Sequence, residues 1–198
     1  MANIIIHFDI ETTDSDAHSG RNGIHELAII MEMGGTVVYK SNHYMKPLPK
    51  CIVNLNSLNA IGANYEDIMA YPDPSIAYNN IRNALERYPL LKGDKWLLSG
   101  FNSQAFDLPV LLSWWGSMKF ATKDYKSFAD WFHFDTLDTR ILAANYLRSE
   151  RHTMPDFKLV TVGKKLLPDV DIDETKAHNA LWDASLSMAI YHRINEKI

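Results

Sequence analysis

Two adjacent glycines, Gly34 and Gly35, separate two runs rich in β-branched, aromatic and other apolar residues, 24–33 and 36–44. A glycine pair between strand-like runs is a strong signal for an antiparallel hairpin. A third such run, 4–10, comes before the polar stretch 12–23, which contains two further glycines. We therefore predict that the chain opens with a three-stranded antiparallel meander, and that 12–23 is a mobile loop between the first two strands.

The middle of the chain alternates helix-like and strand-like segments. Apolar residues recur at helical spacing from Ile76 to Tyr88, and Pro89 marks the stop. The run 95–102 predicts a buried strand that leads into a glycine turn, and a helix is expected to open over 107–115.

An irregular, aromatic-rich piece follows over 116–134, and two helical segments are predicted over 135–147 and 157–167. The last helix should begin near Asn179, with one face formed by Leu181, Ala184, Met188 and His192. Because neither an internal repeat nor a linker is evident, we expect residues 1–198 to form a single α/β domain.

Composition restricts where such a protein acts. With 198 residues, 46% hydrophobic and 22% charged, the chain is typical of a soluble globular protein. No apolar run reaches the roughly 20 residues of a membrane span, and the first residues do not resemble a secretory signal. The single cysteine, Cys51, fits a reducing compartment, so a cytoplasmic location is expected. A formal charge of -4 argues against coating of long duplexes but permits local contact with a strand end.

Three acid-bearing segments are the candidate functional residues. Asp9 and Glu11 are two apart in a predicted strand, so their side chains should project from the same face. Close carboxylates repel one another, and a divalent cation would offset that cost. The alternative is a solvated strand end with two unrelated acids.

Asp107 stands where a strand and glycine turn lead into a helix, in the crevice where open α/β sheets bind ligands. The alternative is an acid that caps the helix. His178 and Asp183 are five apart and so do not share a helix face. We expect Asn179 to cap the last helix, with Asp183 in its second turn and His178 on the preceding loop. The alternative is an exposed histidine beside an exposed acid.

In chain order these segments read DIE (9–11), NSQAFD (102–107) and HNALWD (178–183). They resemble the D-x-E, N-x(2,3)-F-D and H-x-A-x-x-D motifs of the histidine branch of the four-acidic-residue (DEDD) 3'-to-5' exonuclease superfamily. That group includes proofreading subunits, ribonuclease T and exonuclease I. The motifs cover nearly the whole chain, and the tyrosine branch is disfavoured because Asn179 stands four residues before Asp183.

The resemblance implies a ribonuclease H-like mixed sheet, a meander plus parallel strands, flanked by helices. It implies hydrolysis at the 3' end of single-stranded nucleic acid, DNA favoured over RNA, with release of nucleoside 5'-monophosphates. Two divalent cations, Mg²⁺ or Mn²⁺, would serve as cofactors. The resemblance implies that Asp9 is a bridging ligand for both ions, that Glu11 and Asp183 are ligands of the first, and that Asp107 is a ligand of the second. His178 would be a general base outside the metal shell. The implied contacts to substrate are Thr12, Thr13 and Asn102.

Some features depart from the family pattern or leave alternatives open. Asp14 replaces the usual glycine after the two threonines, and three residues separate Asn102 from Phe106, as in exonuclease I and polymerase-type proofreading domains. An inactive nucleic-acid-binding module and an enzyme for very short oligonucleotides remain alternatives. A homodimer and a polymerase or repair partner are both left open.

Several other residues invite a functional interpretation. Six aromatic residues could stack on bases, although packing in the core is favoured for them. Phe106 is expected to be structural. Asp135 and Asp138 should lie at a helix start, where capping explains them. Three lysines before the last motif could face phosphate, although a solvated helix face is favoured. The aromatic group comprises Trp114, Trp115, Phe128, Trp131, Phe132 and Phe134, and the lysines are Lys158, Lys164 and Lys165.

Overall fold

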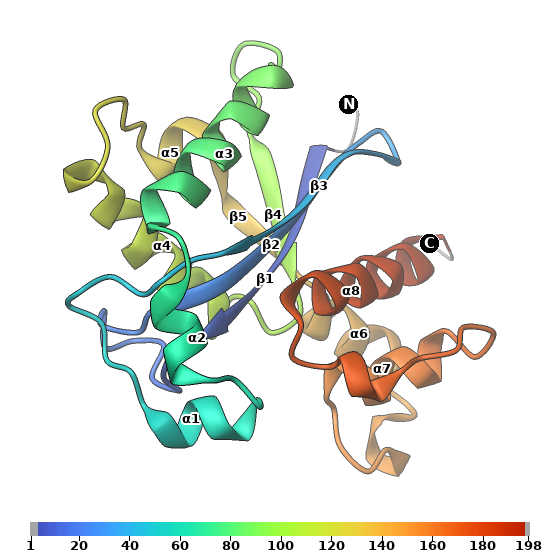
Figure 1. Ribbon diagram of the computed structural model, residues 1–198. Coiled ribbons are helices and arrows are strands. Elements are labelled where there is room, and N and C mark those ends of the chain that lie inside the picture. The colour runs from blue at the N-terminus through green and yellow to red at the C-terminus, as the bar shows by residue number, and fades with distance from the viewer. Residues whose placement is uncertain (1–3, 197–198) are drawn as a thin grey trace.

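A computed structural model describes residues 4–196. Its five strands form a mixed sheet in the order β3-β2-β1-β4-β5, drawn in Figure 1. The predicted meander is confirmed. It comprises β1 (Ile4–Thr12), β2 (Ile24–Met33) and β3 (Thr36–Tyr44), paired antiparallel. Gly34 and Gly35 both have positive φ, 58° and 82°. A tight hairpin turn requires that conformation, and glycine adopts it without strain.

Two strands extend the sheet in parallel on the other side of β1. The predicted buried strand is β4 (Trp96–Gly100), and β5 (Phe132–Asp138) pairs with it at the sheet edge. The helix predicted over 135–147 is therefore wrong in its first part, because α6 spans only Thr139–Tyr146. Residues 133–135 of β5 are exposed, so hydrogen bonding to β4 defines this strand and it lacks the apolar alternation of a buried one.

Helices occupy most of the remaining chain, and several match the predicted positions. Those predicted near 76–88, 107–115, 157–167 and after Asn179 are confirmed as α3, α4, α7 and α8. The bounds are α1 (Leu55–Ala60), α2 (Tyr65–Ala70), α3 (Pro74–Arg87), α4 (Asp107–Ser117), α5 (Phe128–Trp131), α7 (Leu159–Leu166) and α8 (Ala180–Asn195), with 3-10 turns η1 (Met118–Phe120), η2 (Arg151–Thr153) and η3 (Glu174–Lys176).

The sheet separates two helical layers. In Figure 1, α3, α4 and α5 lie on one side of the strands, and α6, α7 and α8 lie on the other. Alternation along β1 assigns its residues to these layers: Ile6, Phe8 and Ile10 enter the main core with residues of α3 and α4. The opposite face of the strand packs on α8, where the ring centroids of His7 and Tyr191 lie 5.4 Å apart. Asp9 and Glu11 share the face of His7.

The face of α8 predicted from sequence packs on the meander. Leu181, Ala184 and Met188 gather with residues of β2 in one apolar cluster. Farther along the same face, His192 Nε2 lies 2.6 Å from the Glu32 Oε2 of β2. This packing fixes the start of α8 relative to β1.

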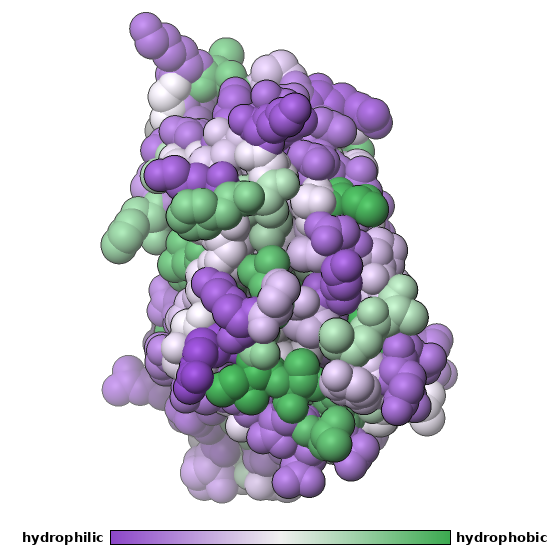
Figure 2. Space-filling view, turned by 60° about the vertical axis from the view of Figure 1, so that its left-hand side comes forward, coloured by the Kyte–Doolittle hydropathy of each residue, from purple (hydrophilic) through white to green (hydrophobic). Residues whose placement is uncertain are grey.

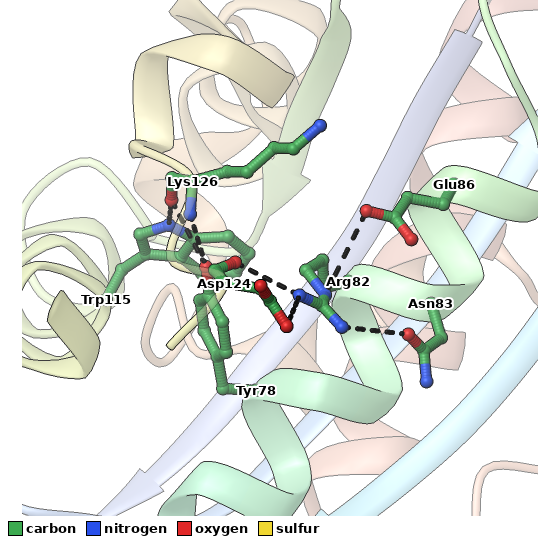
Figure 3. A network of polar contacts seen from close by, with 7 residues as sticks. All are labelled: Tyr78, Arg82, Asn83, Glu86, Trp115, Asp124 and Lys126. Atoms are coloured by element: carbon green, nitrogen blue, oxygen red, sulfur yellow. Dashed lines mark hydrogen bonds and ion pairs between the residues drawn. The ribbon is translucent and has the colours of Figure 1, made fainter. Parts of the chain in front are cut away.

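Aromatic residues fill the other layer, as expected. Trp114, Trp115 and Phe132 are buried in the main core, whereas Phe134 is 98% exposed. Trp115 Nε1 donates to the Lys126 carbonyl at 3.0 Å, and the Lys126 N–H donates to the Tyr78 hydroxyl at 2.9 Å, as Figure 3 shows. These bonds join α3 and α4 to the segment before α5.

The face of the molecule in Figure 2 is mainly hydrophilic, and hydrophobic side chains form separate small groups on it. Among the described residues, no helix has the length and apolar character needed to span a membrane.

Candidate active site

Four carboxylates from three separate parts of the chain converge beside the end of β1. Asp9 and Glu11 come from β1, Asp107 from the first turn of α4, and Asp183 from the first turn of α8. The three other acids lie close enough to Asp9 to raise the pKa of its carboxyl by repulsion. The sheet and two helix starts thus bring together the four acids that the sequence separates by up to 174 positions, from 9 to 183.

Asp107 is positioned by the gap between β1 and β4. The two strands pair only from Ile5 to His7, and beyond that point the Ile10 N–H donates to Asp107 Oδ1 at 3.4 Å. Asp107 stands in the first turn of α4, directly after the N-cap residue Phe106, as the helix-start alternative expected. Its carboxylate also turns toward β1 and is buried there, a contact that a helix-start acid does not require.

The turn before Asp107 requires an unusual backbone conformation. A Cβ on Gly100 would lie 2.9 Å from the Phe8 carbonyl oxygen, so only glycine permits this approach of β4 to β1. Asn102 follows with φ of 63°, and its N–H donates to Asp138 Oδ1 at 3.1 Å. The Gln104 N–H donates to the other Asp138 oxygen, also at 3.1 Å.

Asp138 also caps α6, as predicted, by accepting from the N–H groups of Arg140 and Ile141. One carboxylate therefore holds both the turn that leads to Asp107 and the start of α6. Asp135, expected at the same helix start, is instead exposed on β5 beside His133. Its capping interpretation is wrong because α6 begins later than predicted.

The third segment folds as the sequence indicated except at Asp183, which lies in the first turn of α8 and not in the second, because the helix begins at Ala180. The Asn179 side chain accepts from the Trp182 N–H at 3.0 Å and caps α8. His178 precedes that cap with φ of 66°, in the left-handed region, and its side chain is exposed. Asp183 accepts from the His178 N–H at 3.1 Å and is only 9% exposed. The alternative of an exposed helix acid is therefore wrong for Asp183.

The imidazole of His178 reaches the carboxylates. One of its ring nitrogens and carboxylate oxygens of Glu11 and Asp183 all lie within 4.8 Å of one another. At that separation the ring is near enough to share a ligand or a water with the two acids. The arrangement thus combines a carboxylate cluster with a solvent-exposed proton acceptor.

Burial and mutual repulsion make the ionised cluster unfavourable. Burial, followed by repulsion from neighbouring acids, raises the pKa of Glu11 to about 8 and that of Asp9 well above its usual range. Burial is also the main reason that the pKa of Asp107 rises to about 7 and that of Asp183 to about 6. At neutral pH the four carboxyl groups therefore compete for protons.

This donor set fits hard divalent cations. Four carboxylates supply only oxygen, the ligand type that Mg²⁺ and Mn²⁺ prefer, and cations would relieve the repulsion that raises the pKa values. Asp9, Glu11, Asp107 and Asp183 are the residues that would hold them.

A fifth acid, Glu26, was not singled out from the sequence. It lies opposite Glu11 in the β1–β2 register, and it is buried. Its Oε1 accepts from Asn42 Nδ2 at 2.6 Å, from Asn179 Nδ2 at 3.1 Å and from the Ala180 N–H at 3.2 Å. Glu26 therefore holds the start of α8, which carries Asp183. Predicting this contact would have required the strand register and the position of α8.

The loop after Glu11 is anchored at its base. Thr13 is fully buried: its hydroxyl donates to the Ile52 carbonyl at 2.6 Å and accepts from the Gly23 N–H at 3.1 Å. The Thr12 hydroxyl donates to the Asp14 carbonyl at 2.8 Å. Asp14, which replaces the family glycine, is bonded through its backbone and side chain to Asn22 and Asn54. These contacts support the loop, and a contact of either threonine with substrate stays a prediction.

A cleft of about 610 Å³ opens beside the carboxylates. Asp183 and His178 stand in its wall together with Asn102. The rest of its charged lining is mixed, with two cationic side chains, Arg140 and Lys158, and two acids, Asp156 and Glu174. The aromatic rings in its lining are Phe101 and Phe157. Of the three lysines considered from sequence, the other two form ion pairs with glutamates, Lys164 with Glu174 and Lys165 with Glu150. A solvated face thus accounts for these two, and Lys158 faces the cleft.

Known structures share this fold, although no protein-family profile and no curated protein sequence matches the chain. A zinc-bound complex of E. coli exonuclease I with single-stranded DNA matches with a TM-score of 0.70 at 17% identity, over 100% of this chain and 41% of that one. The nuclease domain of 3'hExo, described as a DEDDh family member bound to rAMP, matches with a TM-score of 0.70 at 16% identity, over 99% and 93%. Cell-death related nuclease 4 matches with a TM-score of 0.70 at 16% identity, over 98% and 64%.

These likenesses establish the class of fold. The chain has the ribonuclease H-like α/β architecture found in 3'-to-5' exonucleases of the histidine-branch group. It spans about two fifths, 41%, of the exonuclease I chain.

Proposed function

We propose that this chain is a metal-dependent 3'-to-5' exonuclease that acts on single-stranded nucleic acid, with DNA preferred over RNA, and that residues 1–198 act as one catalytic domain. The observation that carries the proposal is the convergence of four carboxylates from β1, α4 and α8, with the His178 ring beside two of them. The order of the motifs along the sequence does not by itself place these residues close together in space.

Each residue has a place in the proposed reaction. Two divalent cations, Mg²⁺ or Mn²⁺, would be held by the four acids: Asp9 would be a ligand of both, Glu11 and Asp183 would complete the site of the first, and Asp107 would serve the second. When bound, the cations supply positive charge that favours an ionised water and offsets charge on the leaving oxygen. His178 accepts the proton of the attacking water. The water oxygen bonds to the terminal phosphorus, and the bond from that phosphorus to the 3' oxygen of the preceding nucleotide breaks. A proton from solvent completes the 3' hydroxyl of the shortened strand, and a nucleoside 5'-monophosphate leaves.

The cleft supports binding of a strand end. Arg140 and Lys158 provide positive charge for phosphates at two points of a lining that also contains Asp156 and Glu174. Phe101 offers an aromatic surface for a base, and Asn102 lies beside it in the lining. Thr12, at the base of the loop after Glu11, is the threonine that we place beside the terminal nucleotide.

Two alternatives make different predictions. An inactive binding module would retain strand binding without product, and the presence of all four acids in one cluster argues against it. An enzyme for very short oligonucleotides would hydrolyse dinucleotides faster than long strands. A comparison of the rates on dinucleotides and on long strands separates this alternative from the proposal.

The test uses 5'-labelled single strands of DNA and RNA with Mg²⁺ or Mn²⁺. We expect a ladder that shortens from the 3' end, faster on DNA, together with free nucleoside 5'-monophosphate. Asp9→Ala should abolish it, whereas Asp135→Asn, which changes an exposed acid outside the cluster, should not. A ladder that survives Asp9→Ala would overturn the proposal, and a faster rate on RNA would overturn the sugar preference.

A further inference from the structure

A second group of potential metal ligands lies under α8, outside the carboxylate cluster. His7 of β1, Glu32 of β2 and His192 of α8 place one ligand atom each so that all three lie within 4.8 Å of one another. Glu32 Oε2 is 2.6 Å from His192 Nε2 and 3.5 Å from His7 Nε2. The two imidazole rings are 5.9 Å apart and tilted. The carboxylate thus stands between two histidines.

His7 is the unusual member of this group. Its side chain is fully buried, and neither ring nitrogen has a hydrogen-bond partner among the described residues. A buried polar group without a partner costs about 1–3 kcal/mol, so nearly all such groups in proteins are satisfied. An imidazole nitrogen that points at a carboxylate and a second imidazole has a natural partner in a metal ion.

We propose that His7, Glu32 and His192 form a zinc site that is separate from the carboxylate cluster. Two imidazole nitrogens and one carboxylate oxygen are a donor set that Zn²⁺ accepts, with a fourth position left for water. Imidazole also suits other late transition metals, whereas Mg²⁺ prefers oxygen alone. The His192 side chain is 37% exposed, which gives the ion a path from solvent.

Such an ion would fasten α8 to the sheet. The ligands belong to three elements, and two of these also carry the candidate active site. His7 precedes Asp9 by two residues, about 7 Å along the strand. His192 follows Asp183 by nine residues, about 13 Å along the helix. Zinc at this position would stabilise the packing of α8 on β1 and β2, and so the relative positions of Asp9 and Asp183.

A competing explanation is a purely structural triad, in which His192 bonds to Glu32 and His7 only fills space. The two explanations differ in their response to zinc, because a hydrogen-bonded triad gains nothing from the ion. They also differ in stoichiometry. The zinc site adds one ion per chain that does not depend on the carboxylate cluster.

The test is a zinc titration of chelator-treated protein with Asp9→Asn, in excess Mg²⁺, so that the carboxylate cluster competes poorly. We expect one equivalent of Zn²⁺ to bind, and the Tm to rise by about 5–10 °C at a hundredfold excess over Kd. Adding His192→Gln should remove both effects, whereas His152→Gln, at an exposed histidine, should leave them unchanged. Equal zinc uptake and Tm response with and without His192→Gln would overturn the proposal.

A second measurement does not depend on the folding of the His192 variant. X-ray absorption on the Asp9→Asn protein loaded with one equivalent of Zn²⁺ should detect two imidazoles in the coordination shell. A shell with oxygen alone, or with one imidazole such as His178, would contradict the site. Because both readouts report zinc rather than nuclease activity, their failure leaves the proposed exonuclease function untouched.

Discussion

The carboxylate of Asp183 accepts a hydrogen bond from the backbone N–H of His178 at 3.1 Å, across the start of α8. The acid therefore holds the residue whose imidazole reaches toward it and toward Glu11. His178 adopts φ of 66°, which costs a side-chain-bearing residue about 1–2 kcal/mol. The turn is thus kept in a strained form that brings the acid and the base together.

Substitution of His178 should separate stability from activity. Glycine adopts positive φ without strain, so His178→Gly should be about 1 kcal/mol more stable than His178→Ala. Both variants lose the proposed proton acceptor, and kcat should fall about 10²- to 10⁴-fold in both. Urea unfolding and strand-degradation assays on the two proteins measure these effects. Equal stability of the two variants would argue against the strained turn, and a kcat close to that of the wild type would remove His178 from the base role.

The carboxylate cluster should make metal-free protein less stable as pH rises. The pKa of Glu11 is raised to about 8 and that of Asp107 to about 7, whereas unfolded carboxyls titrate near 4. At these carboxyls the native state holds more protons than the unfolded state between about pH 4 and pH 8, so their titration removes stability as pH rises. Each extra bound proton corresponds to about 1.4 kcal/mol per pH unit. Burial lowers the pKa of His7 to about 3 and that of His25 to about 4, and these two groups oppose the trend until unfolded histidines lose their protons near pH 6.5. In EDTA we therefore expect Tm to fall from pH 7 to pH 8.

Metal and a matched variant test the origin of that slope. Mg²⁺ should raise Tm more at pH 8 than at pH 5, since cations compete with protons for the same oxygens. Asp9→Asn removes a charge that lies near the other acids, so it should flatten the slope in EDTA, whereas Asp135→Asn should not. A wild-type Tm that stays level from pH 7 to pH 8 in EDTA would contradict the raised pKa values.

Local signals predicted the parts of the fold that local chemistry determines. The Gly34–Gly35 turn specified the β2–β3 hairpin, and strand alternation placed Asp9 and Glu11 on one face. The cap at Asn179 located the start of α8, and the five-residue spacing put His178 on the loop before it. Each of these inferences depends on a few neighbouring residues.

Contacts between distant segments could not be predicted from the sequence. Residues 135–138 of β5 were predicted as the start of a helix and residues 132–134 as irregular, because the pairing of β5 with β4 leaves no apolar alternation at an exposed edge. The role of Glu26 depends on α8, more than 150 positions away in the chain. Asp107 lies at the start of a helix, as the sequence indicated, but its contact with the Ile10 N–H depends on how the end of β4 lies beside β1. In each case the deciding partner lies on an element far away in sequence.

Glu26 should act as a positioning residue. Glu26→Ala would leave the buried Ala180 N–H and the part-buried side-chain amides of Asn42 and Asn179 without this acceptor, at a cost of about 1–3 kcal/mol. Displacement of the α8 start should lower kcat about 10- to 100-fold. Glu26→Gln keeps an oxygen acceptor and should recover most of the activity, and Glu66→Ala, at an exposed acid on α2, serves as the control. Equal kcat for Glu26→Ala and wild type would exclude a positioning role.

Two glycines near Asp107 should respond in opposite directions to the same substitution. A Cβ on Gly100 would lie 2.8 Å from Ser103 Cβ and 2.9 Å from the Phe8 carbonyl oxygen, so Gly100→Ala should cost about 1–3 kcal/mol. It should also lower activity, because the turn that leads to Asp107 must move. A Cβ on Gly116, within α4, meets nothing within 4 Å, so Gly116→Ala should gain about 0.5–1 kcal/mol. Urea unfolding of both variants tests the pair, and a stable Gly100→Ala protein with full activity would contradict the close approach of β4 to β1.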